Sequence, residues 1–126
     1  MSAARQPKVL IIEDEPLIAL DLSSILEEVD CQICGVAESA DDAVAIAERE
    51  RIDLILADIR INGEADGITA VQRIRERSPV PVLFISSNWP ELRKRGMGDA
   101  MVIGKPFLPV LLKQAIREAL SEGVRR

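Results

Sequence analysis

Four uninterrupted apolar runs dominate this chain, and each of them ends close to a polar residue. The runs are Val9–Ile12, Leu54–Ala57, Val82–Ile85 and Met101–Ile103. Short runs without polar alternation are typical of strands in a parallel sheet that is covered on both faces, although periodicity alone leaves buried helix as an alternative. Because ligands of open α/β sheets bind at the carboxyl ends of the strands, the residues that follow the runs are candidates for a site.

Segments with helical spacing separate the runs. Ser39 with Asp42 three residues later predicts a capped helix that ends near Arg51. A further strand is expected over 31–37, and the helix near 90–95 is weak and short. The clearer apolar stripes are Ile18, Leu22, Ile25, Leu26 and Val29 after Pro16; Ile68, Val71 and Ile74 after Gly67; and Leu108, Leu111, Leu112, Ala115, Ile116 and Ala119.

This order of strand and helix, repeated five times, predicts the fold class. Right-handed crossovers convert it into a doubly wound, five-stranded parallel α/β sheet. We expect the flavodoxin-like (βα)5 arrangement with strand order 2-1-3-4-5.

The polar residues at the ends of the runs suit phosphoryl chemistry. Glu13, Asp14 and Asp58 supply carboxylate oxygens, which Mg²⁺ prefers to nitrogen or sulfur ligands. Ser86 adds a hydroxyl group and Lys105 a positive charge, and both groups can hold phosphate oxygens. We therefore expect these five side chains to form one site.

Composition agrees with a single domain. A chain of 126 residues with 48% hydrophobic residues can bury one core, and we place the domain at 7–121 with loose termini at 1–6 and 122–126. A net charge of −5 argues against a nucleic-acid surface. With no apolar run long enough to span a membrane and no signal-peptide pattern, the chain is expected to be soluble and cytoplasmic, without a membrane partner.

Two local patterns receive ordinary interpretations. Cys31 and Cys34 form a C-x-x-C, but this spacing on a strand sends the side chains to opposite faces, and no His exists to complete a metal site. Two reduced thiols are therefore expected. The basic run Arg93-Lys94-Arg95 indicates a solvated helix face, with partner contact as the alternative.

Taken together, the motifs resemble the receiver domain of a bacterial two-component response regulator. They are the acidic pair Glu13-Asp14, Asp58, Ser86 and Lys105-Pro106-Phe107, and the resemblance extends from residue 8 to 120. Each motif alone is weak, since polar residues also cap strands or form salt bridges. All of them together, in order and at strand ends, are specific.

The resemblance implies a role for each residue. Asp58 would be the nucleophile that takes a phosphoryl group from a phosphohistidine and becomes an aspartyl phosphate. Lys105 would pair with one phosphoryl oxygen, and Ser86 would move to hydrogen-bond another. Pro106 is expected to follow a cis peptide bond. The donor must be another protein, because this chain contains no His.

The resemblance also implies the metal ligands. Asp14 and Asp58 would hold Mg²⁺, Glu13 would help through water, and the main-chain carbonyl of Arg60 would be a further ligand. Mg²⁺ would neutralise the charge that builds up on the transferring group.

Several positions depart from the family pattern. The segment 59–67 is about one residue longer than usual and lacks a common proline, and Ser87 stands where Ala is frequent. Lys105 follows Ser86 by 19 positions, which shortens the fourth helix. Val102 stands where many receivers carry a Tyr or Phe that swings inward during the switch. The route by which a signal leaves the domain is therefore expected to differ.

Two further expectations concern the switch and its lifetime. Trp89 lies three residues past Ser86 and directly before Pro90, so movement of Ser86 should change the surroundings of the indole; a static anchor is the alternative. Arg60 and Asn88 should flank the path of an attacking water, and Arg60 is expected to cover the phosphoryl group and slow hydrolysis.

The expected function is that of a stand-alone phosphoacceptor rather than a turnover enzyme. Its partners would be a sensor histidine kinase or a histidine phosphotransfer protein, and a docking protein that reads the fourth helix, fifth strand and fifth helix. One alternative is a fragment of a hybrid kinase. A Mg²⁺-dependent phosphohydrolase would want an Asp where Arg60 stands, and a flavodoxin-like cofactor binder would want a Ser/Thr/Gly-rich loop in place of residues 13–16.

Overall fold

A computed structural model shows the alternation of strands and helices that the sequence predicts. It describes residues 5–60, 66–87, 89–97 and 100–125, and for residues 89 and 123–125 it describes the backbone only. Within these residues the strands are β1 (Lys8–Ile12), β2 (Gln32–Ala37), β3 (Leu54–Asp58), β4 (Val82–Ile85) and β5 (Met101–Ile103). The helices are α1 (Pro16–Glu28), α2 (Ala40–Arg49), α3 (Gly67–Arg75), α4 (Trp89–Lys94) and α5 (Pro109–Arg125).

The strands of the described residues form one parallel sheet in the order β2-β1-β3-β4-β5, which confirms the predicted fold class. The register aligns the carboxyl ends of the central strands. Asp58 pairs with Ile85, and Ile85 pairs with Ile103. The residues that follow these ends are therefore brought to one edge of the sheet.

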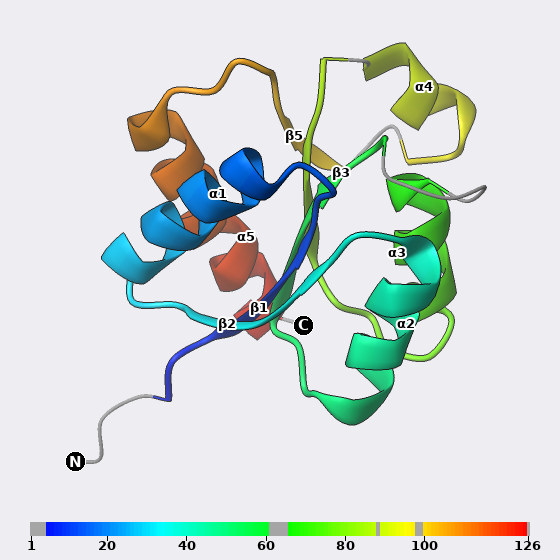
Figure 1. The fold of residues 1–126 in the computed structure, drawn as a ribbon, viewed down its shortest axis with the longest axis horizontal. Helices are drawn as coiled ribbons and strands as arrows, with labels where there is room; N and C mark the ends of the chain where they lie inside the picture. Colours follow the sequence, from blue (N-terminus) through cyan, green and yellow to red (C-terminus); the bar gives the residue numbers. More distant parts are fainter. Residues whose placement is uncertain (1–4, 61–65, 88, 98–99, 126) are drawn as a thin grey trace.

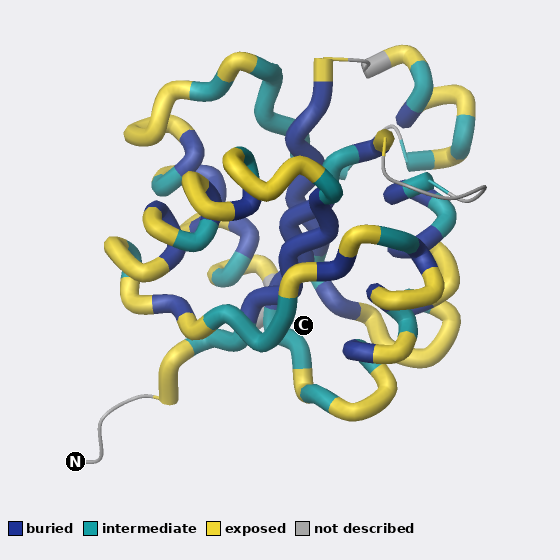
Figure 2. The backbone as a smooth tube through the Cα atoms, in the orientation of Figure 1, coloured by how far each residue is buried: buried dark blue, intermediate teal, exposed yellow. Residues whose placement is uncertain are grey.

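Helices cover both faces of the sheet (Figure 1). Val9 and Ile11 of β1 point into a core shared with α1 and α5, while Leu10 and Ile12 point into a core shared with α2 and α3. The two-residue period of a strand explains this division, because successive side chains face opposite sides. Figure 2 shows the resulting buried centre and the exposed outer sides of the helices.

The predicted helix starts are present. Pro16 occupies the first turn of α1. The hydroxyl of Ser39 accepts a hydrogen bond from the backbone N–H of Asp42 at 3.1 Å, as expected of an N-cap. Helix α2 ends at Arg49, slightly before the predicted Arg51, because the backbone of Glu50 is extended, with φ −125° and ψ 145°.

Helix α5 differs from the prediction at both ends. Leu108 precedes the helix and Leu111 lies at the edge of the apolar stripe, so these side chains are 61% and 49% exposed. The buried side chains of the stripe are Leu112, Ala115, Ile116 and Ala119. Residues 122–125, which the sequence analysis places in the loose C-terminus, continue the helix to Arg125. None of the described helices is long and apolar enough to cross a bilayer.

Candidate functional site

A polar pocket of about 610 Å³ lies at the carboxyl edge of the sheet. Its walls come from the segments that follow β1, β4 and β5 and from the end of β3. The lining residues are Asp14, Glu15, Asp58, Ile59, Arg60, Ser86, Ser87 and Lys105. The structure therefore brings together four of the five side chains that the sequence singled out, and the fifth, Glu13, contacts the same cluster.

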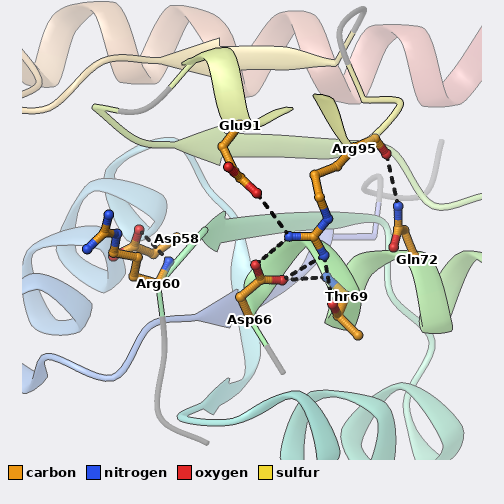
Figure 3. Close-up of polar contacts among 7 residues, drawn as sticks. All are labelled: Asp58, Arg60, Asp66, Thr69, Gln72, Glu91 and Arg95. Atoms are coloured by element: carbon orange, nitrogen blue, oxygen red, sulfur yellow. Dashed lines mark hydrogen bonds and ion pairs between the residues drawn. The ribbon is translucent and has the colours of Figure 1, made fainter. Parts of the chain in front are cut away.

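Asp58 is paired with Lys105 in this pocket. The Nζ atom of Lys105 donates a hydrogen bond to Oδ2 of Asp58 at 2.8 Å. The backbone N–H of Arg60 lies 3.3 Å from Oδ1 of Asp58, the contact drawn in Figure 3. Asp58 is the last residue of β3, and its side chain is 12% exposed, so the carboxylate is accessible from the pocket.

Glu13 lies deeper than Asp58. Its side chain is 1% exposed, its Oε1 atom is 3.8 Å from Nζ of Lys105, and its Oε2 atom accepts a hydrogen bond from the backbone N–H of Glu15 at 3.2 Å. The pKa of Glu13 is raised from its usual 4.5 to about 7, and burial is the main cause. The hydrogen bond from Glu15 lowers this pKa, and the charge of Asp58 raises it. Glu13 therefore releases its proton near neutral pH.

Lys105 lies between the two carboxylates. Burial opposes its charged form, but the hydrogen bond to Asp58 and the charges of Asp58 and Glu13 outweigh this, so the pKa of Lys105 is raised above 10.5. The ammonium group is therefore charged at neutral pH. The peptide bond from Lys105 to Pro106 is cis, as expected from the resemblance.

Ser86, directly after β4, also lines the pocket. It is 4% exposed, and its backbone N–H donates to the carbonyl of Ile103 at 3.0 Å, which fixes the end of β4 against β5. Its neighbour Ser87 is exposed and lines the same pocket. Ser86 and Lys105 thus line the same pocket.

The donor set fits a divalent cation that keeps much of its water. Among the residues that the structure describes, no three His, Cys, Asp or Glu side chains form a ready-made metal cluster. Mg²⁺ does not require one, since it usually binds one or two carboxylates and completes its shell with waters and phosphate oxygens. Asp14 and Asp58 line one pocket and are carboxylates of this kind.

The structure describes some of the residues that were expected to take part in the switch. Val102 is half-buried and lines a pocket of about 450 Å³ between α4 and β5, together with Leu92, Met97 and Ala100. Pro106 is exposed. The side chain of Trp89 and all of Asn88 lie outside the described residues, so the expectations attached to them stay predictions.

One assignment made from the sequence is wrong. Arg95 belongs to the basic run that was expected to be solvated, but its side chain is 29% exposed and its guanidinium is 2.7 Å from Oδ2 of Asp66 (Figure 3). Asp66 also caps α3, because its Oδ1 atom accepts from the backbone N–H of Thr69 at 2.9 Å. An Asp directly before a helix is a preferred N-cap residue, so the position of Asp66 before Gly67 could have predicted the capping role of Asp66.

The two cysteines behave as predicted. Cys31 belongs to the core on the α1 and α5 side of the sheet, whereas Cys34 packs against the core on the α2 and α3 side. Both thiols are free. Burial raises the pKa of each thiol, so the reactive thiolate form is disfavoured.

Comparison with known families identifies the family of this chain. The model of the response regulator receiver domain matches residues 9–117 of the chain. The chain belongs to this family. The matched range contains every member of the pocket described above, so the receiver motifs and the observed cluster coincide.

Several similar proteins carry the name PhyR. The phyllosphere-induced regulator PhyR of Methylorubrum extorquens is 40% identical, with 100% of this chain aligned to 49% of that protein. The solution structure of the receiver domain of PhyR from Erythrobacter litoralis is 34% identical, covers 92% of this chain and 91% of its own, and has a TM-score of 0.82. The anti-anti-sigma factor PhyR from Bartonella quintana is 33% identical over 97% of this chain and 50% of its own, with a TM-score of 0.79.

These likenesses define a receiver domain and no more than that. The chain spans about half the length of the M. extorquens regulator, and the agreement with the isolated E. litoralis domain extends over almost the whole of both chains. The M. extorquens relative is named as a regulator rather than as an enzyme.

Proposed function

We propose that this receiver domain is the phosphoacceptor of a two-component phosphorelay. Asp58 takes the phosphoryl group, and its modification switches a surface that a downstream protein recognises. The observation that carries the proposal is the pocket in which Asp58, Asp14, Ser86 and Lys105 meet. A nucleophilic carboxylate, a hydroxyl and a fixed ammonium group in one pocket are the parts that phosphoryl transfer to Asp requires.

The transfer is a displacement at phosphorus. A carboxylate oxygen of Asp58 forms the new phosphorus–oxygen bond while the bond from phosphorus to the donor imidazole nitrogen breaks, and the imidazole leaves with the electron pair. The donor is a histidine of a sensor kinase or of a phosphotransfer protein, because this chain has no His. Lys105, 2.8 Å from Asp58, can turn its ammonium group to a phosphoryl oxygen, and Ser86 can donate to another.

The proposed phosphoryl transfer uses Mg²⁺ as its cofactor. When bound, it supplies positive charge that offsets the negative charge of the transferring group. Asp14 and Asp58 would hold it with the carbonyl of Arg60, and Glu13 would act through water. The buried position of Glu13, behind Lys105, suits such an indirect role better than direct ligation.

The surface formed by α4, β5 and α5 is proposed as the docking site of a downstream protein. The pocket between α4 and β5, with Val102 on its wall, provides an apolar hollow at this surface. The B. quintana PhyR is described as an anti-anti-sigma factor, so an anti-sigma protein is one class of partner to test. We place the domain in the cytoplasm, with no nucleic-acid or membrane partner.

Two alternative functions would use the same residues. A Mg²⁺-dependent phosphohydrolase with an aspartyl nucleophile would use the same pocket, but Arg60 occupies the position where a second Asp would act as acid and base. The domain could equally be the receiver of a larger hybrid kinase, which would share the chemistry at Asp58.

Incubation with Mg²⁺ and acetyl phosphate distinguishes a receiver from a hydrolase. A receiver gains one phosphoryl group per chain and then loses it slowly, whereas a hydrolase releases phosphate over many turnovers without stable labelling. Capture of a protein by the domain only after treatment with the phosphodonor supports the docking function. Equal capture by treated and untreated domain contradicts it.

A further inference from the structure

Arg95, directly after α4, ties this helix to the first turn of α3. Its guanidinium donates two hydrogen bonds to the carboxylate of Asp66, at 2.7 and 3.2 Å, and a third to the hydroxyl of Thr69 at 2.9 Å. Gln72 of α3 donates from its side chain to the carbonyl of Arg95 at 3.2 Å, and Glu91 of α4 lies 3.5 Å from the guanidinium. Figure 3 shows these contacts converging on Arg95.

These contacts are stronger than an ordinary surface ion pair. The Arg95 and Asp66 side chains are each 29% exposed, and the two parallel hydrogen bonds fix the geometry of the pair. Burial alone would raise the pKa of Asp66, but the hydrogen bonds from Arg95 and Thr69 outweigh it and lower that pKa. The carboxylate is therefore held in its charged form by the contact.

Helix α4 depends on this attachment. It has six residues, which is too short for a helix to be stable by itself. Among the side chains of α4 that the structure describes, Leu92 is the buried one. The Arg95 contacts therefore anchor the C-terminal end of this short helix to the first turn of α3.

The other side of Asp66 is fixed to the phosphoacceptor. The backbone N–H of Gly67 donates to the carbonyl of Ile59 at 2.7 Å. A Cβ atom at Gly67 would lie 1.8 Å from the carbonyl oxygen of Asp58, so the two backbones are in direct contact. A continuous path of described contacts thus runs from α4 through Arg95, Asp66 and Gly67 to the main chain of Asp58.

We propose that Arg95 is a positioning residue that couples the placement of α4 to the geometry of the phosphorylation site. This inference rests on the proposed phosphoacceptor function. Arg95 holds Asp66 and Gly67 against the end of β3 and so keeps Asp58 oriented for its ligands. By linkage, binding at Asp58 stabilises the attachment of α4 in return.

The test measures how tightly the pocket binds beryllofluoride with Mg²⁺, an analogue of the phosphoryl group. We expect Arg95→Gln to weaken this binding about three- to tenfold, since fixing a site before binding contributes to affinity. Arg93→Gln removes the same charge from an exposed position within α4, two residues earlier, and should leave the affinity unchanged. Arg95→Lys keeps the charge but loses the two parallel N–H donors of the guanidinium, so its affinity for beryllofluoride should lie between those of Arg95→Gln and Arg93→Gln.

Asp66→Asn tests the path through Asp66. Asn retains the cap on Thr69, so the variant folds even if Arg95→Gln does not, and its affinity should fall in the same direction. The double variant should bind no more weakly than Arg95→Gln alone, because both changes break one contact. Amide exchange in α4 should slow on beryllofluoride binding in the parent and much less in Asp66→Asn.

Each outcome has a distinct meaning. If the variants melt at lower temperature but bind beryllofluoride as tightly as the parent, Arg95 is only a structural brace and the proposal is overturned. If the effects of Arg95→Gln and Asp66→Asn add fully, the path through Asp66 is wrong. If the parent itself does not bind beryllofluoride with Mg²⁺, the phosphoacceptor function fails.

Discussion

Lys105 holds its ammonium group 2.8 Å from Asp58 and 3.8 Å from Glu13, so one cation contacts two carboxyl groups at the edge of the sheet. The pair with Asp58 has the shorter distance and the hydrogen bond. In the proposed function, the same ammonium group turns to a phosphoryl oxygen after transfer. Lys105 therefore stabilises the pocket before phosphorylation and the product after it.

Removal of this cation should destabilise the metal-free domain. Lys105→Met leaves Asp58 and Glu13 without their shared partner, and we expect the free energy of unfolding to fall by about 1–2 kcal/mol at low salt, less than for a fully buried pair because Lys105 is 26% exposed. Urea denaturation in EDTA measures the loss. Added Mg²⁺ should restore part of it by supplying positive charge.

Lys113→Met is the matched control, because Lys113 also forms an ion pair, with Glu28, on the α1 and α5 side of the molecule. Its loss should be within about 0.5 kcal/mol and insensitive to Mg²⁺. Equal losses in the two variants, with no response to Mg²⁺ in either, would show that Lys105 does not balance the pocket.

Glu13 should make stability depend on pH. Its pKa is raised in the folded state, so between pH 4.5 and about 7 the folded protein holds a proton that the unfolded chain has released. The free energy of unfolding therefore falls as the pH rises through this window. One pKa unit corresponds to about 1.36 kcal/mol, so the full contribution is ~3 kcal/mol.

Glu13→Gln should abolish this part of the pH dependence. The variant should match the parent near pH 5 and be more stable than the parent at pH 8, in the absence of Mg²⁺. Glu15→Gln, at an exposed position, serves as the control. Parallel stability curves for Glu13→Gln and the parent from pH 5 to 8 would refute the raised pKa.

The strands and most of the site could be predicted because they depend on short patterns in the sequence. Continuous apolar runs fix the strands, and because parallel strands end at one edge, the residues after them had to meet. Asp58, Ser86 and Lys105 can therefore be assigned to one site from their positions in the sequence alone. Leu108 and Leu111 show the limit of the same reasoning, since an apolar stripe does not reveal which of its members the core reaches.

The contact between Arg95 and Asp66 could not be predicted in this way. The two residues are 29 positions apart, and an ion pair leaves no periodic signal in the sequence. A run of three basic residues in a weak helix is usually solvated, so the pattern predicts that Arg95 is exposed like its neighbours. Only the contacts of Arg95 with the start of α3 separate it from the exposed Arg93.

Gly67 should be intolerant of any side chain. The Cβ atom of Gly67→Ala would lie 1.8 Å from the carbonyl oxygen of Asp58, so the main chain at the phosphoacceptor must move. We expect a loss of about 2–3 kcal/mol in stability and slower phosphorylation by a small phosphodonor. Thermal melts and labelling rates measure the two effects.

Gly35→Ala provides a control of the same chemical change. Its Cβ atom would meet the end of the Ile46 side chain at 2.9 Å, and that side chain can adjust. Its cost should stay within about 1 kcal/mol, with a normal labelling rate. If Gly67→Ala proves as mild as Gly35→Ala, the close contact with Asp58 is not a constraint on the site.

Arg60 should lengthen the life of the phosphorylated state. Its backbone N–H contacts Asp58, and its exposed side chain starts at the wall of the pocket, where it can cover the phosphoryl group. Arg60→Ala should therefore shorten the half-life of the phosphoprotein, whereas Arg93→Ala should not. A half-life that is unchanged or longer in Arg60→Ala would mean that Arg60 does not shield the group from water.

The most direct test of the proposed function is the intact mass of the protein after incubation with Mg²⁺ and acetyl phosphate. The parent and Asp41→Asn, a control at an exposed carboxylate, should each gain one phosphoryl group. Asp58→Asn should gain none while keeping its fold in a thermal melt, because Asn preserves the shape of the side chain. Full labelling of a folded Asp58→Asn variant would contradict the assignment of Asp58 as the phosphoacceptor.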